Sequence, residues 1–175
     1  MNTDITYRLL TNNDKAQYRI LRLECLQLYP DNFGVLYQEE IAAPTLKFDM
    51  YLERNATDSF VYGAFDNDTL IGMCGFIHET RIKKQHRGTI SNMYVRKEYK
   101  SNGIGTMLLR QTIQHAFRNE SIEIIELGVV HNNSNAIELY KRLGFTQYSY
   151  LQHAFKHNGT YWDQLIMCLH KSDYQ

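Results

Sequence analysis

The stretch Val95-Arg96-Lys97-Glu98-Tyr99-Lys100-Ser101-Asn102-Gly103-Ile104-Gly105-Thr106 marks the point where an apolar run ends, two glycines follow and a helical pattern begins. We therefore expect a strand, a loop and a helix to meet here. The first N–H groups of a helix have no partners within it, and the helix dipole attracts anions to them. Beside glycines, which carry no Cβ atom, such a helix start predicts a phosphate-binding loop. A lone Gly-x-Gly can also be only a tight turn, so the loop by itself leaves both interpretations open.

Neither common nucleotide-binding signature is present in this loop. No Gly-Lys-Ser/Thr follows the glycines, as a P-loop would require, and the G-x-G-x-x-G spacing of dinucleotide-binding folds is missing. The segment Lys100-Ser101-Asn102-Gly103-Ile104-Gly105 instead resembles the pyrophosphate loop of the GCN5-related N-acetyltransferases (GNAT), whose pattern is Q/R-x-x-G-x-G/A after a strand that ends in Val. Lys100 stands where that family usually has Gln or Arg, so a cation is kept without the planar guanidinium group.

A second block makes this resemblance specific. The segment His131-Asn132-Asn133-Ser134-Asn135-Ala136-Ile137-Glu138-Leu139-Tyr140-Lys141-Arg142-Leu143-Gly144-Phe145 is similar to the N-x-x-A-x-x-L-Y-x-x-x-G-F signature of the same family. It follows the loop at the family's usual distance, and two ordered motifs rarely coincide by chance. The resemblance covers roughly the second half of the chain strongly and the first half only through the pattern of expected elements.

Apolar periodicity predicts the secondary structure around these motifs. Expected strands lie at 5–9, 59–65, 70–78, 88–95, 122–130, 145–156 and 160–169, and expected helices lie before Pro30 and at 33–42, 45–55, 103–120 and 133–142. The resemblance implies one N-acetyltransferase domain over residues 1–175. Its fold is α/β (mixed α+β), with a partly split seven-stranded sheet flanked by helices, in the order β-α-α-β-β-β-α-β-α-β-β. We expect the strand at 122–130 to run parallel to the strand before it, because a helix connects them, and to be buried on both faces.

The resemblance also implies acetyl-CoA as co-substrate. The strand at 88–95 would pair with the pantetheine arm, and the loop amides would bind the diphosphate. Asn133 resembles the family asparagine that hydrogen-bonds the arm, although asparagine at a helix start is also a common cap. The cofactor-binding candidates are Met93, Tyr94, Val95, Lys100, Ser101, Asn102, Gly103, Ile104, Gly105, Thr106, Asn133 and Tyr140.

Tyr140 matches the family tyrosine whose hydroxyl faces the sulfur and protonates or stabilises the departing thiolate. Direct attack by an amine on a thioester needs an acid for the thiolate and a base for the ammonium proton, but no covalent enzyme intermediate. The alternative for Tyr140 is a core tyrosine on an amphipathic helix. The motif around it favours the functional interpretation.

The general base is an open question in the sequence. Some relatives use a glutamate midway along the strand before the loop, where this chain has Ser91 and Asn92. Glu79, His78 and Glu126 are the nearest alternatives, acting directly or through a water molecule. Each could equally be an ordinary polar residue at the surface or at a sheet edge.

The early helices form one wall of the acceptor cleft in the family. Tyr29, Phe33, Tyr37 and Glu40 are therefore candidate substrate-facing residues, with ordinary packing as the alternative. We predict acetylation of the primary amine of a small molecule. Open alternatives are transfer of another acyl group, acetylation of a protein N-terminus or lysine, and an acetyl-CoA sensor that binds without turnover.

Composition agrees with a soluble enzyme domain. The chain has 175 residues, of which 43% are apolar, and no apolar run is long enough to cross a membrane. Its 19 basic and 19 acidic residues balance, which argues against nucleic acid or a membrane surface as partner. No signal peptide is recognisable, and we interpret Cys25, Cys74 and Cys168 as reduced thiols of a cytoplasmic protein. No metal site is expected, and the last two strands leave a homodimer open.

Overall fold

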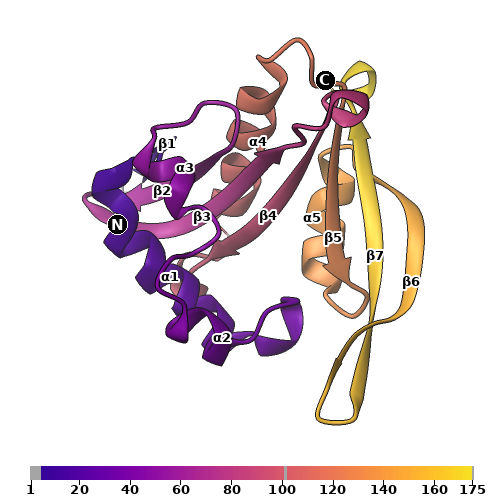
Figure 1. The fold of residues 1–175 in the computed structure, drawn as a ribbon, viewed down its shortest axis with the longest axis horizontal. Helices are drawn as coiled ribbons and strands as arrows, with labels where there is room; N and C mark the ends of the chain where they lie inside the picture. The colour runs from indigo at the N-terminus through magenta and orange to yellow at the C-terminus, as the bar shows by residue number, and fades with distance from the viewer. Residues whose placement is uncertain (1–4, 101, 175) are drawn as a thin grey trace.

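One twisted sheet of seven strands, in the spatial order β1-β2-β3-β4-β5-β7-β6, runs through the molecule (Figure 1). The computed structural model describes residues 5–100 and 102–174. The strands are β1 (Ile5–Leu9), β2 (Phe60–Asp66), β3 (Thr69–His78), β4 (Arg87–Val95), β5 (Ile124–Val130), β6 (Thr146–His157) and β7 (Thr160–His170). All neighbouring strands are antiparallel except β4 and β5, which are parallel as the helical crossover between them predicts.

The two halves of the sheet separate between β4 and β5. These strands pair only where 87–89 meets 124–126, near the start of each strand. Beyond that point they diverge, and Figure 1 shows the gap widening toward their C-terminal ends. The expected partly split, seven-stranded sheet is therefore confirmed.

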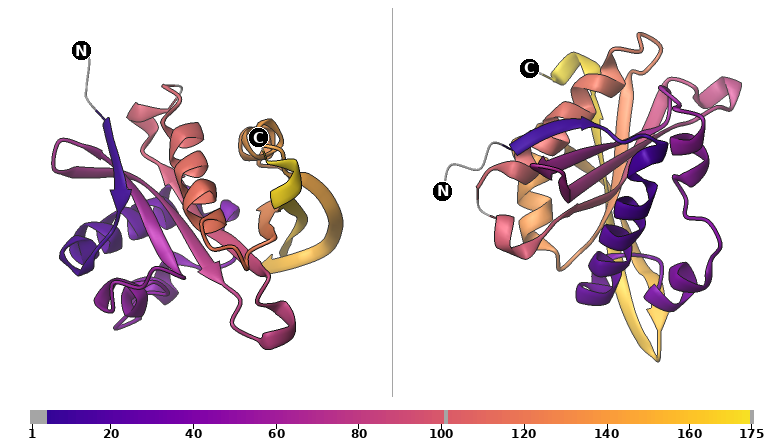
Figure 2. Two further views of the ribbon diagram at one scale, coloured as in Figure 1. Left: turned by 90° about the horizontal axis from the view of Figure 1, so that it is seen from above. Right: turned by 90° about the vertical axis from the view of Figure 1, so that its left-hand side faces the viewer.

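In the described part of the chain five α-helices cover the sheet, and Figure 2 shows helices on both of its sides. They are α1 (Lys15–Leu28), α2 (Tyr37–Ala42), α3 (Asp49–Glu53), α4 (Ile104–Phe117) and α5 (Ser134–Arg142). The three helices expected from periodicity before the second strand are present as α1, α2 and α3, whereas the element order implied by the resemblance has only two helices there. The early helices are also shorter than expected, since the chain between Phe33 and Leu36 does not adopt a helical conformation.

Two hydrophobic cores lie on opposite faces of the sheet. On one face, α4 packs through Leu108, Leu109, Ile113 and neighbouring residues, which recur at the helical spacing that the sequence predicts. On the other face, α1 packs with Phe48 and the β2 and β3 strands. The two cores hold β3 and β4 rigidly between them, which fixes one wall of any site at the split.

The expectation that β5 is buried on both faces is wrong. Its residues alternate, with Ile125, Leu127 and Val129 buried while Gly128 is exposed. The exposed position, Gly128, lies in the lining of the cleft, so this part of β5 faces the cleft and not a covering helix. Within the described residues, no helix is long and apolar enough to cross a membrane.

Candidate active site

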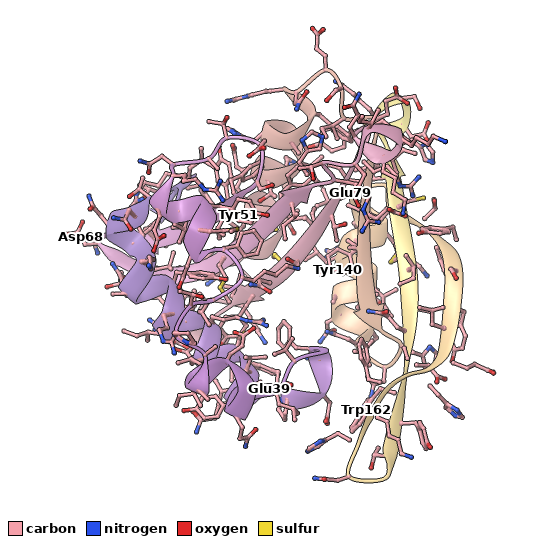
Figure 3. The ribbon with its side chains drawn as sticks, viewed as in Figure 1. Glu39, Tyr51, Asp68, Glu79, Tyr140 and Trp162 are labelled. Carbon is pink, nitrogen blue, oxygen red and sulfur yellow. The ribbon has the colours of Figure 1, made fainter. Side chains whose placement is uncertain are left out.

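A cleft of about 980 Å³ opens where β4 and β5 part. Its walls come from β4, β5, the start of α4, one side of α5, the segment between α1 and α2, and the β6–β7 hairpin. Figure 3 labels Tyr140, which α5 contributes to this lining. The cleft therefore brings together both sequence motifs and the early helices.

The start of α4 has the geometry of an anion site. Gly103 adopts the left-handed conformation (φ +74°) before Ile104, and no side chain caps the helix. A Cβ atom added at Gly103 would meet no atom within 4 Å, so the space in front of the helix is open. The first N–H groups of α4 have no acceptors within the helix. This arrangement fits a diphosphate group.

The remaining loop residues differ in their surroundings. Lys100, Gly105 and Thr106 line the cleft with Gly103, whereas Ile104 is buried in the core and Asn102 is exposed outside the lining. Ser101, also a predicted binding residue, lies outside the described residues.

The Lys100 ammonium group contacts the α1 side of the cleft. Its Nζ atom donates a hydrogen bond of 2.9 Å to the Tyr29 hydroxyl and lies 4.2 Å from the centre of the Tyr29 ring. Lys100 thus joins the two walls at the cleft's edge. A phosphate contact by Lys100 stays a prediction, and it would compete with this bond.

A bulge deforms β4 beside the cleft. The register between β3 and β4 shifts opposite Gly75, and Asn92 has a positive φ of 55°. The Asn92 amide donates a 2.9 Å hydrogen bond to the buried hydroxyl of Tyr18 on α1. Asparagine tolerates this conformation better than most residues, which is the only local signal of the bulge.

The end of β4 is tied to α1. The Tyr94 hydroxyl donates a 2.9 Å hydrogen bond to Glu24, and Arg96 forms an ion pair of 3.0 Å with the same carboxylate. Burial and this hydrogen bond raise the pKa of Tyr94. Met93, Tyr94 and Val95 all line the cleft, as expected for residues that face the pantetheine arm.

Tyr140 lies on helix α5 and lines the cleft. The residue is 7% exposed, and its ring packs edge-on against Phe145 with centroids 5.9 Å apart. Burial raises the pKa of Tyr140, so its hydroxyl is protonated at neutral pH. At the start of the same helix Asn133 caps the backbone of Ala136 at 3.4 Å and also lines the cleft.

The structure does not bring Glu79 or Glu126 into the cleft lining. Glu79 accepts a hydrogen bond from the backbone of Arg81 in the β3–β4 connection. Glu126 forms an ion pair with Arg87 and accepts a hydrogen bond from Tyr148. Burial opposes its ionisation, but these partners outweigh that effect and hold the pKa of Glu126 below its usual value. A carboxylate held in this way is a poor general base.

Three of the four acceptor-wall candidates line the cleft. These are Tyr29, Phe33 and Glu40, whereas Tyr37 packs beside the α1 core instead. Figure 3 labels Glu39 on α2 and Trp162 on β7, and these labels help to find α2 and the β6–β7 hairpin, the two elements at the acceptor end of the cleft.

Sequence reasoning missed Arg22. It is 3% exposed, and its guanidinium group holds both oxygens of Glu40 through Nε at 2.8 Å and Nη2 at 2.7 Å. The same group lies 5.0 Å from the centre of the Phe33 ring. The available signal was a cation on the buried arc of α1, between Tyr18 and Cys25.

Lys47, Phe155 and Gln164 were also missed, and all three line the cleft. Phe155 closes one end, because a Cβ atom on Gly34 would lie only 2.6 Å from its ring. No local pattern could have found these residues, since they come from segments that meet only in the folded chain. Among the described residues, no group of three or more His, Cys, Asp or Glu side chains is placed to hold a metal ion.

Comparison with known proteins adds a family and a fold. The profile of the "Acetyltransferase (GNAT) family" matches residues 22–145. N-alpha-acetyltransferase 30 of Schizosaccharomyces pombe is 29% identical over 125 residues, which cover 71% of this chain and 82% of that protein. Spermidine N(1)-acetyltransferase of Escherichia coli K12 is 27% identical over 100 residues, which cover 57% of this chain and about half (54%) of the enzyme.

Solved structures share the whole fold. An acetyltransferase of the GNAT family from Streptococcus pneumoniae superposes with a TM-score of 0.84 at 22% identity, covering 95% of this chain and 99% of that one. The protein yncA from Salmonella typhimurium, whose structure contains acetyl-CoA as its cofactor, superposes with a TM-score of 0.77 at 20% identity over 95% of this chain and 93% of that one.

Proposed function

The chain belongs to the acetyltransferase (GNAT) family, and we propose that it transfers the acetyl group of acetyl-CoA directly to the primary amine of a small molecule. Family membership makes the protein an acetyl-CoA-dependent N-acetyltransferase. The small-molecule acceptor, the roles of individual residues and the direct mechanism are the proposal.

One observation carries this proposal: the open start of α4 at Gly103 and the side chain of Tyr140 line the same cleft. Coenzyme A has its diphosphate at one end of a long arm and its thiol at the other. The N–H groups at Gly103, Ile104 and Gly105 would hold the diphosphate, and β4 from Met93 to Val95 would run along the arm. Asn133 would bind the arm while it caps α5.

Tyr140 would act as the acid of the reaction. The amine nitrogen forms a bond to the acetyl carbon and gives up a proton to water, the carbon–sulfur bond breaks, and the sulfur takes the proton that Tyr140 holds. Burial raises the pKa of Tyr140, so the hydroxyl stays protonated until the thiolate forms. The tyrosine regains a proton from solvent when the products leave.

The amine must reach the acetyl group in its neutral form. Among the described residues, two carboxylates line the cleft: Glu40, which is engaged by Arg22, and Glu138, which is exposed on α5 and to which we assign no role. Glu79 and Glu126 lie outside the lining, so we assign neither of them the role of base. We infer that the ammonium proton is lost to water in the open cleft, which requires no dedicated carboxylate.

A peptide N-terminus is the alternative acceptor, and the similarity to an N-alpha-acetyltransferase supports it. A sensor that only binds acetyl-CoA is the alternative without turnover. Release of free CoA from acetyl-CoA should be measured with amino acids, polyamines, aminoglycosides and peptides. Turnover with a small amine supports the proposal, and turnover with peptides alone supports the first alternative. Acetyl-CoA binding without any turnover supports the sensor.

Two further expectations belong to this proposal. Cys25, Cys74 and Cys168 are free and buried, which supports a cytoplasmic, reducing location. The edge strand β6 is largely exposed and carries Tyr148 and Leu151 on its surface, which supports pairing of two copies through this strand.

A further inference from the structure

The acceptor end of the cleft contains three charged side chains, Arg22, Glu40 and Lys47. Arg22 and Glu40 neutralise each other in a two-point ion pair, and both side chains are largely buried. Each Glu40 oxygen accepts one hydrogen bond from Arg22, so the negative charge of Glu40 is already balanced within the protein. The charge left over at this end of the cleft is that of Lys47.

Lys47 has no hydrogen bond and no ion pair with any residue that the structure describes, although it lines the cleft. Lys47 is an exposed residue at the edge of the cleft, and partial desolvation of its ammonium group by the surrounding protein, with the nearby charge of Arg22, lowers the pKa of Lys47. An anion bound beside the ammonium group would relieve both effects. Lys47 is thus a cation in the cleft without an anionic partner in the described part of the protein, and an anionic group of the substrate could supply that partner.

A second unpartnered group lines the same cleft. The Ser91 Oγ atom is buried and has no hydrogen-bond partner among the described residues. Ser91 lies opposite Gly75 in the β3–β4 register, and a Cβ atom on Gly75 would meet the ring of Phe48. Paired residues present their side chains to the same face, so Ser91 lies on the sheet face that Phe48 covers. Phe48 follows Lys47 directly in the sequence. A buried hydroxyl without a partner destabilises the fold unless a ligand satisfies it.

We propose that the amine acceptor also carries a carboxylate, which Lys47 binds through its charge and Ser91 through a hydrogen bond. The inference rests on the proposed acetyl transfer and names its substrate class. One ammonium and one hydroxyl match a single carboxylate, whereas a phosphate dianion usually requires more cationic donors. A polyamine would need carboxylates for its further ammonium groups. Of the two carboxylates among the described lining residues, Glu40 is neutralised by Arg22, and Glu138 lies on α5, on the other side of the cleft from α1 and α2.

Matched substrates test this inference. Amino acids and their carboxamides differ in the carboxylate alone, so kcat/KM for each pair is measured at low salt with saturating acetyl-CoA, beside spermidine. We expect the acid of a pair to be preferred by roughly tenfold or more, as for a charge-assisted hydrogen bond. Lys47→Met should reduce this preference to less than about twofold, and Lys47→Arg should keep part of it. Ser91→Ala should weaken it to a smaller extent.

Lys83→Met is the control, because Lys83 is exposed and lies outside the cleft lining. It should leave the preference unchanged. A preference for carboxamides or spermidine in the unmodified enzyme would overturn the inference while acetyl transfer stands. So would an unchanged preference in Lys47→Met.

Calorimetry with the CoA-saturated protein gives a readout without turnover. Tighter binding of the acid than of its carboxamide, lost in Lys47→Met, supports the inference. Equal binding of the two overturns it. Separate titration with acetyl-CoA tests the proposed function, because a protein that binds the acids but not acetyl-CoA contradicts acetyl transfer alone.

Discussion

In Tyr140, the ring and the hydroxyl group have separate roles, because the ring packs in the protein and the hydroxyl is the proposed acid. Its ring is buried against Phe145, and this packing does not depend on the hydroxyl. Tyr140→Phe should therefore fold normally and bind acetyl-CoA unchanged, while kcat falls by roughly 100-fold or more through loss of the acid. Steady-state kinetics and calorimetry measure the two effects separately. Tyr51→Phe, outside the cleft lining, is the control. An unchanged kcat for Tyr140→Phe would remove Tyr140 as the acid.

His115 couples stability to pH on the opposite side of the sheet. Its ring packs edge-on against Phe60 with centroids 4.5 Å apart, and its Nδ1 atom is buried without a hydrogen-bond partner among the described residues. Burial, aided by the charge of Arg118, lowers the pKa of His115 from its ordinary value of 6.5. The unfolded chain thus takes up the proton more readily than the folded one.

The stability that neutral His115 contributes is present above about pH 6.5, the unfolded value, and is lost as pH falls through the lower folded pKa. Urea unfolding at pH 7.5 and pH 5 should show a larger loss of stability in the unmodified protein than in His115→Gln, which cannot take up this proton. Parallel losses in the two proteins would contradict the prediction.

At the scale of the element, the loop before α4 has a glycine, Gly103, in the left-handed conformation with open space in front of it. Gly103→Glu should weaken acetyl-CoA binding by about tenfold or more, because a carboxylate at the helix start repels the diphosphate and fills its site. Gly159 in the β6–β7 turn is a matched control, since it also has a positive φ (81°) and no atom within 4 Å of an added Cβ. Both substitutions should cost about 1 kcal/mol of stability through backbone strain. Calorimetry should find weakened binding in Gly103→Glu alone. Equal affinities of the two variants would refute the phosphate role.

The contact between α1 and α2 depends on a buried ion pair. Arg22→Met removes one partner and leaves the Glu40 carboxylate unpaired, which should lower the free energy of unfolding by about 3 kcal/mol. Arg22→Met combined with Glu40→Leu should recover part of that loss, because no charge remains buried. Urea denaturation of the single and double variants measures the difference. A double variant less stable than Arg22→Met would show that the pair's packing matters more than its charge.

At the scale of the whole molecule, the free edge of the sheet at β6 is the surface by which copies would pair. Leu151 is 44% exposed on this strand. If two copies associate through β6, Leu151→Lys should weaken the dimer at least tenfold, because a charge would be buried at the interface. Ile82→Lys, on a residue that is 84% exposed in the turn before β4, should have no effect. Sedimentation at several concentrations measures the association, and a monomer throughout would contradict it.

Much of the fold and part of the site could be predicted because they depend on near neighbours in the chain. The apolar period of α4 locates its start to within a residue, and the crossover helix dictates the parallel pairing of β4 and β5. The loop at Gly103 and the Asn133 to Phe145 block are two short motifs, and residues from both line the cleft proposed to bind the cofactor. Tyr140 could be predicted for that reason, and it lines the cleft as expected for its role.

By itself, then, the sequence determined most of the secondary structure, the family resemblance and the two motifs proposed to bind the cofactor, since each depends on residues close together along the chain. Only the tertiary structure decided the acceptor side. Folding brings Arg22, Lys47 and Phe155 to one cleft from segments far apart in sequence, and it leaves Glu79 and Glu126 outside. Whether these residues meet depends on how the helices pack on a sheet that splits after Thr89, and this cannot be predicted from a local sequence pattern.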